Sequence, residues 1–497
     1  MRRVGTRRGR LIGLGIAAAG LLAAVLITTG VLAPKRVGSI ATEGGPSSSA
    51  RTPPQSLRPP TITGIAQAGL WVVATPGSWS AEPSSYNFSW RRCDRSGRRC
   101  RLLARTNALR YALARGDVGR RLRVSVVASN ALGSSRPAPS SPTAAVAPAR
   151  RLTHLEYVFN DGRVSVYDID HGFKLRETFT LPGTRRGVRG VMVSPATHTM
   201  YVSFGGDGGG AGKGSVLAYD LLAKRVIWSI EEKTGIDSGA VSADGKLLYM
   251  PDGAASSDGD WYILDTADGK VAGRIRSPGT GPHDGVMSAD GRILQLGDRD
   301  YARLPIYDTQ TGTVRTQVGP LVGGVRPNTI NGADTVSFTT ANDFDGFQVG
   351  SITSGRVLYT ESFGPCTGPL TTCSHGISLS PDNRQLYVID TVRKAVQIWD
   401  VHGVAEGIMP AHVANVAVDG LSGEEKGCAY ACEREGWIQH SLDGRYVFVG
   451  DAGEVIDTRI HKVVARITNL LNTRMFLEID WAGGVPVATS GRQGIGY

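Results

Sequence analysis

Residues 374–390 read SHGISLSPDNRQLYVID, and VQIWD follows at 396–400. The first stretch contains an apolar run, a turn centred on Ser380 and a second run in which apolar and polar residues alternate. Alternation with a period of two is typical of β-strands, and Ser, Pro, Asp and Asn together are typical of a turn. The stretch therefore predicts two strands joined by a turn, followed by a third strand that ends in Asp400.

The same pattern occurs six times along the chain. The six segments read GVMVSPATHTMYVSF, GAVSADGKLLYM, GVMSADGRILQL, NTINGADTVSFTT, GISLSPDNRQLYVID and WIQHSLDGRYVFVGD. Their turn residues, spaced by 48, 46, 43, 49 and 61 positions, are Ser194, Ser242, Ser288, Asn331, Ser380 and Ser441. A period near 45 residues with four short strands per repeat is that of a β-propeller blade. An insertion that contains Cys428 and Cys432 explains the longest spacing.

The two ends of this region complete one repeat between them. HLEYVFN, RVSVYDID and KLRETFTL supply three strands at the start, with no repeat-type strand before them. RMFLEIDWAGGVPVATS, near the C-terminus, resembles the opening of a repeat without the rest. One blade shared between both ends would close the ring and leave no free edge strand. We therefore expect an all-β fold with a β-propeller of about seven blades over residues 152–497.

A family resemblance supports this expectation. SHGISLSPDNRQLYVID with VQIWD resembles the YVTN-type β-propeller repeat, and the resemblance extends over essentially all of residues 152–491. It implies the fold but little about function, because related propellers include lactonases, streptogramin-type lyases, the heavy subunit of an amine dehydrogenase and proteins without known activity. We find no match to the metal-binding acids of the lactonases and no C-x-x-C-H haem motif. We therefore expect no metal and no cofactor.

Residues 59–148 predict a separate small β-sandwich, because short apolar alternations are separated there by Gly, Pro and Ser. The segments PPTITGIAQAGLWVVATPGSWS, YNFSWRRC and DVGRRLRVSVVASNALGSS resemble bacterial Ig-like repeats of cell-surface proteins. The resemblance implies that Trp90 lies in the core and that residues 117–119 form the turn before the penultimate strand. Thirteen arginines against three acids make this part basic. We expect either a solvated basic face or a contact with an anionic envelope polymer.

The N-terminus predicts export. Five arginines in residues 1–10 precede an uncharged apolar run over residues 11–33, which is long enough to cross a membrane as a helix. The basic segment should stay in the cytoplasm and place the remainder outside it. Residues 11–33 are either an uncleaved single-pass anchor in the cell membrane or a signal peptide that is removed on secretion. Residues 34–58 are typical of a flexible Ser- and Pro-rich linker.

The six cysteines form three pairs that are close in sequence: Cys93 with Cys100, Cys366 with Cys373, and Cys428 with Cys432. An oxidising compartment favours disulfides between such pairs. Zinc is the alternative, but no pair has C-x-x-C spacing. We therefore expect three disulfides.

The charge is distributed unevenly. The net charge is +11, but residues 1–150 hold 23 Lys and Arg against four acids, whereas the remainder holds 32 against 40. A uniformly basic surface for nucleic acid would not show this division. We expect no nucleic-acid partner.

The position five residues before each turn residue should begin the innermost strand of its blade and face the mouth of the central channel. These positions hold Arg189, Asp237, His283, Arg326, His375 and Gly436, and alignment of VPVAT with LYVID adds Arg474. Such a ring is either the ordinary polar wall of a wet channel or a cationic site for a small anion. We expect a binding or scaffold protein. The alternative is a lactonase-, lyase- or dehydrogenase-like enzyme in which His283 and His375 act as acid and base and the arginines hold charge.

The glycine-rich stretch GGDGGGAGKGS at 205–215 is superficially similar to a phosphate-binding loop. Asp207 stands where the first glycine belongs, and Gly214 replaces the Ser or Thr that follows the lysine. The stretch also connects two predicted strands of one blade. We therefore interpret it as a long hairpin turn.

Overall fold

The computed structural model describes residues 52–491 except 82, 107–108, 368–371 and 422–433. The described chain is all-β, as predicted, and its helices are short 3-10 turns: η1 (Arg115–Asp117), η2 (Thr184–Arg186), η3 (Gly209–Ala211), η4 (Val404–Glu406) and η5 (Thr468–Asn472). Among these residues no helix has the length and apolar character needed to span a membrane. The apolar run at 11–33 lies outside the described part of the chain.

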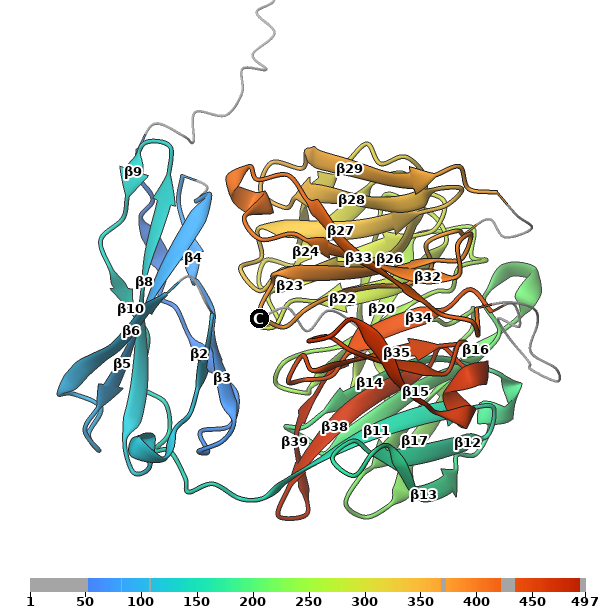
Figure 1. Cartoon of the computed structure of the whole chain (residues 1–497), viewed down its shortest axis with the longest axis horizontal. Helices are drawn as coiled ribbons and strands as arrows, with labels where there is room; N and C mark the ends of the chain where they lie inside the picture. The colour runs from blue at the N-terminus through green and yellow to red at the C-terminus, as the bar shows by residue number, and fades with distance from the viewer. Residues whose placement is uncertain (1–51, 82, 107–108, 368–371, 422–433, 492–497) are drawn as a thin grey trace, which may run out of the picture. The chain divides into compact units, whose positions relative to one another are not determined.

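The N-terminal part contains three small antiparallel sheets (Figure 1). The first pairs β1 (Ser56–Arg58) with β4 (Ser78–Trp79). The second has the order β2 (Ile62–Thr63), β3 (Trp71–Ala74) and β7 (Arg110–Ala112). The third has the order β10 (Ala138–Pro139), β8 (Arg121–Asn130), β5 (Ser85–Cys93) and β6 (Cys100–Thr106), with β9 (Gly133–Ser134) also paired to β8. β1 falls within residues 34–58, the predicted linker.

Trp90 lies at the centre of this part, as expected. It belongs to β5, which pairs with a strand on either side, and it is completely buried. The centroid of its ring lies 5.5 Å from that of Tyr111, which belongs to β7 of the second sheet. Cys93 and Cys100 are directly opposite each other on β5 and β6 and form a disulfide. Strand pairing and a shared aromatic core therefore hold this part together.

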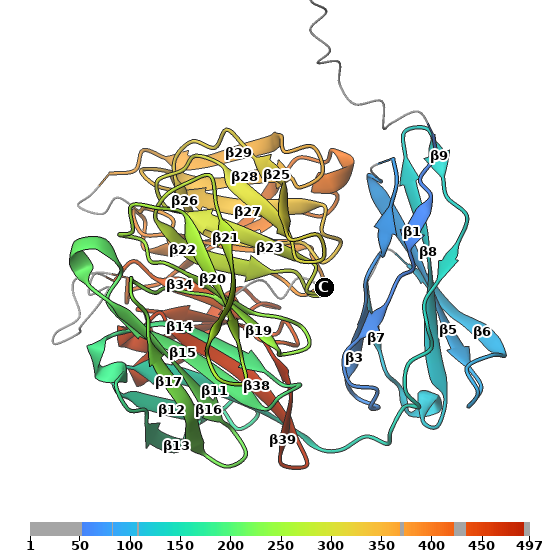
Figure 2. The same ribbon diagram turned by 180° about the vertical axis from the view of Figure 1, so that it is seen from behind.

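Six four-stranded antiparallel sheets follow one another along the rest of the chain (Figures 1 and 2). The first three contain β14 (Val188–Ser194), β15 (Thr199–Gly205), β16 (Gly214–Asp220) and β17 (Arg225–Glu231); β18 (Ala240–Val241), β19 (Leu247–Pro251), β20 (Asp260–Asp265) and β21 (Val271–Arg276); and β22 (Pro282–Met287), β23 (Ile293–Asp298), β24 (Leu304–Asp308) and β25 (Thr313–Val318). The next three contain β26 (Val325–Ile330), β27 (Val336–Ala341), β28 (Asp345–Ser351) and β29 (Val357–Gly364); β30 (Ile377–Leu379), β31 (Gln385–Asp390), β32 (Ala395–Asp400) and β33 (Ala411–Ala417); and β34 (Trp437–His440), β35 (Tyr446–Gly450), β36 (Glu454–Asp457) and β37 (Lys462–Arg466).

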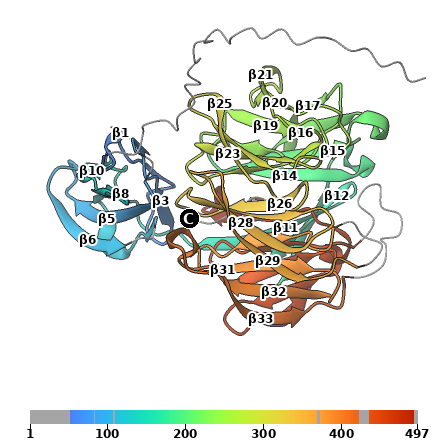
Figure 3. The same cartoon turned by 90° about the horizontal axis from the view of Figure 1, so that it is seen from above.

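Burial changes in a regular way across each sheet. The first strand, such as β14, is buried along its whole length, whereas the fourth, such as β17, alternates exposed and half-buried residues. The first strands of the six sheets contact one another in series, from β14 to β34. Successive sheets therefore stack through their apolar faces, and Figure 3 shows this stacking from another direction.

The turn residues that mark the repeat hold the hairpin between the first two strands. Ser380 Oγ donates to Asp382 Oδ1 at 2.6 Å and accepts a hydrogen bond from the backbone N–H of Gln385 at 2.9 Å. Ser242, Ser288 and Ser441 make the corresponding contacts in their own sheets. In the fourth sheet the Asn331 side chain replaces serine and accepts from the N–H of Val336 at 3.0 Å. This shared hydrogen bonding explains why the turn is the clearest repeated feature of the sequence.

A further sheet joins the two ends of this region. Its order is β13 (Lys174–Thr180), β12 (Arg163–Asp168), β11 (Leu152–Asn160), β38 (Phe476–Ala482) and β39 (Val485–Thr489). In Figure 1 the teal strand β11 lies beside the red strand β38. We call it the closing sheet. The prediction that strands from both ends share one sheet is confirmed.

The alignment predicted for VPVAT is wrong. This segment forms β39, which pairs with the free side of β38 instead of taking the place of a second strand. Residues 489–491 consequently line a cavity together with the ends of β14, β18 and β22. The strand that corresponds to a first strand is β38, because β11 occupies the second position beside it.

Candidate functional site

The six charged positions of the predicted ring all lie at or just before the start of a first strand. Arg189, His283 and Arg326 belong to β14, β22 and β26, and the others lie two or three residues before the start of β18, β30 and β38. Their exposed fractions lie between 4% and 8%. Arg474 keeps its place in the set, although the alignment that suggested it is wrong. Each sheet therefore contributes a buried polar side chain at the same end of its first strand, apart from the sixth, which has Gly436.

Backbone irregularities place two of these side chains. In the pairing of β14 with β15, Val188 is opposite Phe204 and Gly190 is opposite Ser203, so Arg189 is an extra residue. The pairing of β22 with β23 leaves out His283 in the same way. An extra residue of this kind is a β-bulge, which redirects a side chain away from the regular alternation of the strand.

Arg189 is paired with a buried carboxylate. Its Nη1 lies 3.1 Å from Asp207 Oδ1, which also accepts a hydrogen bond from the backbone N–H of Ala254 at 2.9 Å. Burial raises the pKa of the Asp207 carboxyl above its ordinary value, and the Arg189 guanidinium opposes that rise. Asp207 comes from the glycine-rich hairpin between β15 and β16, so this hairpin is more than a connection.

Ser238 links three neighbouring positions of the ring. Its backbone N–H donates to Asp237 Oδ1 at 2.8 Å and to the carbonyl oxygen of His283 at 3.1 Å. Its hydroxyl donates to the carbonyl oxygen of Arg189 at 3.0 Å. The structure therefore brings Arg189, Asp237 and His283 together through their backbones.

Glu435 links two further positions. Its Oε2 lies 3.0 Å from Arg474 Nη1 and 3.8 Å from His375 Nε2. Arg474 Nε also donates to Asp451 Oδ2 at 2.7 Å. The three residues Glu435, His375 and Arg474 precede the first strands of three different sheets, so one carboxylate joins three sheets.

The tautomer of His375 follows from its other contact. Nδ1 lies 2.9 Å from the carbonyl oxygen of Gly436, and a carbonyl oxygen can only accept. Nδ1 therefore carries a proton, and in the neutral imidazole the lone pair is on Nε2, the atom that faces Glu435. A histidine held in this way can accept a proton at a defined atom.

Arg326 contacts the segment that contains the second disulfide and leads into His375. Arg326 Nη2 donates to Thr372 Oγ1 at 2.8 Å, and Cys373 is bonded to Cys366. The disulfides predicted for Cys93 with Cys100 and for Cys366 with Cys373 are confirmed. The third pair, Cys428 and Cys432, lies outside the described residues.

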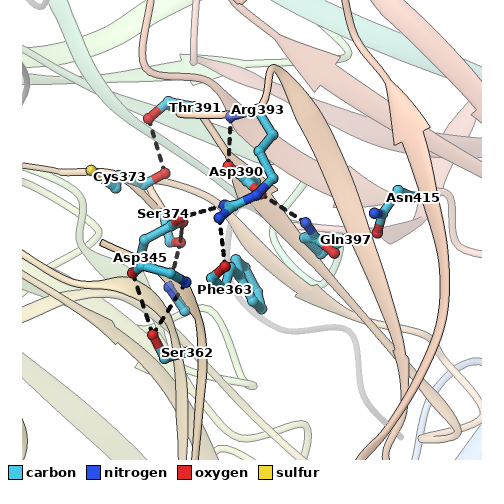
Figure 4. Close-up of polar contacts among 12 residues, drawn as sticks. Asp345, Ser362, Phe363, Cys373, Ser374, Asp390, Thr391, Arg393, Gln397 and Asn415 are labelled. Carbon is cyan, nitrogen blue, oxygen red and sulfur yellow. Dashed lines mark hydrogen bonds and ion pairs between the residues drawn. The ribbon is translucent and has the colours of Figure 1, made fainter. Parts of the chain in front are cut away.

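A buried ionic network supports the same segment (Figure 4). Arg393 Nη1 lies 2.7 Å from Asp345 Oδ2 and 2.9 Å from Asp390 Oδ2, and both carboxylates are completely buried. Burial raises the pKa of Asp345, and Arg393 opposes the rise. The Ser374 hydroxyl donates to Asp345 Oδ1 at 3.3 Å, and the N–H of Thr391 donates to the carbonyl oxygen of Cys373 at 2.9 Å. The chain that leads into His375 is therefore anchored on two sides.

The site is mixed in charge instead of purely cationic. Sequence reasoning found the arginines and histidines but missed the acids that contact them, Asp207, Glu435 and Asp451. Glu435 could have been found, because it is adjacent to Gly436, the one position at which the aligned ring has no side chain. Gly436 has a φ of 84°, a left-handed conformation that favours glycine, and its neighbour supplies the charge.

No family model and no curated protein sequence matches the chain. The fold is similar to the solved structure of the periplasmic gluconolactonase from Pseudomonas aeruginosa, with a TM-score of 0.50 and 16% sequence identity. The match covers 68% of this chain and 98% of that one. At this identity the likeness concerns the fold alone, and it agrees with a propeller-like arrangement of the sheets.

Proposed function

We propose that this protein is an extracytoplasmic binding protein that holds a small polyhydroxy carboxylate at one mouth of a seven-bladed propeller. The observation that carries the proposal is that buried arginines, histidines and carboxylates gather at the same end of successive sheets. Guanidinium groups bind carboxylates through charge-assisted hydrogen bonds, and carboxylates accept hydrogen bonds from hydroxyl groups. A ligand with both groups suits both kinds of side chain. A simple anion such as phosphate would be opposed by Asp207, Asp237 and Glu435.

We also propose an identity for each domain and a location for the protein. The six four-stranded sheets and the closing sheet are seven blades of YVTN type, and the sandwich before them is Ig-like. Residues 11–33 hold the protein in the cell membrane, with everything after them outside the cytoplasm. The two disulfides support this location, because disulfides persist in oxidising compartments. The basic sandwich would contact an anionic envelope polymer.

A second candidate function is hydrolysis of the lactone form of such an acid. The arrangement of His375 favours it, because Nε2 faces Glu435, whose same oxygen contacts Arg474. Water would attack the lactone carbonyl carbon and lose a proton to His375 Nε2, while Arg474 stabilises the oxyanion. The ring C–O bond would then break, and the proton would pass to the leaving alkoxide to give the hydroxy acid. The likeness to a gluconolactonase fold makes gluconolactone the first substrate to try. His283 is the other histidine that could act as acid or base.

Calorimetry on the detergent-purified full chain would test the binding proposal. Gluconate should bind, whereas methyl glucoside, which lacks the carboxylate, and phosphate, which lacks the hydroxyls, should bind more weakly. Arg326→Gln should remove one charge-assisted contact and weaken gluconate binding by about 10- to 100-fold. The matched control is Arg356→Gln. Arg356 is exposed and lies in the turn between β28 and β29 of the same sheet, so this variant should bind gluconate as the wild type does. Equal affinity for gluconate and methyl glucoside would contradict the proposal.

Hydrolysis separates the two candidates. The release of acid from glucono-1,5-lactone should be followed at constant pH against the spontaneous rate. If the protein accelerates hydrolysis and His375→Gln abolishes the acceleration while gluconate still binds, the protein is an enzyme. Binding without acceleration supports the binding protein.

A further inference from the structure

One histidine and three carboxylates meet on one face of the closing sheet. Cross-strand pairing sets His154 of β11 opposite Asp480 of β38, and Glu156 opposite Glu478. Residues two apart on a strand share a face of the sheet, so all four side chains lie on the same face. We call these four residues the seam cluster. They lie outside the ring.

The ligand atoms of three residues of the seam cluster, His154, Glu478 and Asp480, are close together. His154 Nδ1 lies 2.7 Å from Asp480 Oδ1 and 3.5 Å from Glu478 Oε1. One nitrogen or oxygen atom from each of these three residues lies within 4.8 Å of the others. The backbone N–H of Leu442 donates to the other oxygen of Glu478 at 2.6 Å and holds that carboxylate in place. Such a spacing suits ligands of one metal ion.

Glu156 is the independent observation that points to a missing ligand. It is 1% exposed, and within the described part of the chain its Oε1 accepts no hydrogen bond. It is directly opposite Glu478, a pairing that places two Cβ atoms about 4.5–5.5 Å apart. A buried carboxylate oxygen normally has a donor or a cation beside it. Three buried carboxyl groups therefore lie beside one imidazole.

We propose that His154, Glu156, Glu478 and Asp480 bind one divalent transition-metal ion, Mn²⁺ or Zn²⁺. Imidazole nitrogen together with carboxylate oxygen suits these ions better than Mg²⁺ or Ca²⁺, which prefer oxygen alone. The His154 side chain is 28% exposed, which gives the ion a path from solvent. The ion would connect β11 to β38, which are 326 residues apart at this contact. It would therefore fasten the first and last parts of the repeat region to each other, because a link that closes a long loop restricts the unfolded chain.

Metal titration of the full chain after treatment with EDTA tests the proposal. The wild type should bind one equivalent of Mn²⁺, followed by electron paramagnetic resonance, or of Zn²⁺, followed by calorimetry, and its thermal midpoint should rise. Glu156→Gln and Asp480→Asn should weaken binding by more than the roughly 10- to 100-fold that changes outside a coordination sphere cost. The matched control is His171→Asn, which removes an exposed imidazole 2.8 Å from Asp168 and should leave binding unchanged.

Two outcomes would overturn the proposal. One is a wild type that binds neither ion stoichiometrically, which would make the seam cluster a set of residues that share protons. The other is Glu156→Gln binding the metal as tightly as the wild type. Because either variant could fail to fold, the visible absorption of Co²⁺ added to the wild type gives a further test. Absence of the bands of nitrogen- and oxygen-coordinated Co²⁺ would contradict the site without any substitution. None of these measurements depends on a ligand of the ring.

Discussion

The ring and the seam cluster both bury charged side chains, but they balance charge in different ways. In the ring, Arg189 meets Asp207, and Arg474 meets Glu435 and Asp451. In the seam cluster a single histidine faces three carboxylates. Buried charges are tolerated when they are paired, and removal of one partner leaves the other uncompensated. The protein itself supplies both signs of charge in the ring, whereas the seam cluster has three carboxyl groups to one imidazole, and a bound cation would add positive charge there.

The largest effect is expected from removing a cation of the ring. Arg474→Met would leave Glu435 and Asp451 buried without their guanidinium partner, so the free energy of unfolding should fall by about 3–5 kcal/mol. Chemical denaturation of the variant and the wild type measures this loss. The control Lys224→Met breaks an exposed pair with Glu177, and such pairs contribute about 0–1 kcal/mol. A loss for Arg474→Met as small as that of the control would show that the ring is not balanced by these contacts.

The two disulfides sharpen the comparison, because both close loops with a sequence separation of 7. Serine replacement of both cysteines of either pair should lower the free energy of unfolding by about 2–3 kcal/mol, from the entropy of the unfolded loop. Of these two bonds, Cys366–Cys373 is the one next to a ring residue, so its removal should also weaken gluconate binding. Denaturation and calorimetry on both double variants check this. Equal loss of affinity in the two would indicate a general effect of destabilisation.

The buried carboxyl group of Asp298, outside the ring and the seam cluster, should make the free energy of unfolding depend on pH. Burial raises the pKa of Asp298 to about 7, so the folded protein binds a proton there that the unfolded chain releases near pH 4. Stability from this group is present at low pH and is lost as the pH rises towards 7. Between pH 6 and pH 8 the wild type should lose about 1–1.5 kcal/mol relative to Asp298→Asn. Thermal midpoints of both proteins across this range measure the difference, and parallel curves would refute the expectation.

The smallest effect is expected in the seam cluster without metal. Glu156→Gln keeps the size of the side chain and replaces a carboxyl group whose pKa is raised by burial and by the neighbouring Glu478. In EDTA, the free energy of unfolding should stay within about 1 kcal/mol of the wild type, unlike the loss expected for Arg474→Met. Denaturation in EDTA checks this. A loss of several kcal/mol would mean that Glu156 has a stabilising partner in the protein.

Much of the fold could be predicted because its signals are local. The Ser-centred turn, illustrated by Ser380, returns in four of the six four-stranded sheets because a serine hydroxyl makes the same hydrogen bonds in each of these hairpins. The disulfides at Cys93 and Cys366 could be predicted because their partners are only seven residues away. The positions of five ring side chains could be predicted because each lies five residues before its turn, whereas the alignment that suggested Arg474 is wrong.

Only the tertiary structure decided which charges meet. Asp207 contacts Arg189 from a hairpin that looked like a connection, and Glu435 meets Arg474 across sheets. His154 and Asp480 are neighbours although 326 residues separate them. Spacing along a strand determines which face a side chain occupies, whereas contacts between faces depend on how separate sheets pack. For this reason the sequence by itself determined the all-β repeat and the ring of positions, and the packing and pairing of the strands decided which charged groups meet in the ring and in the seam cluster.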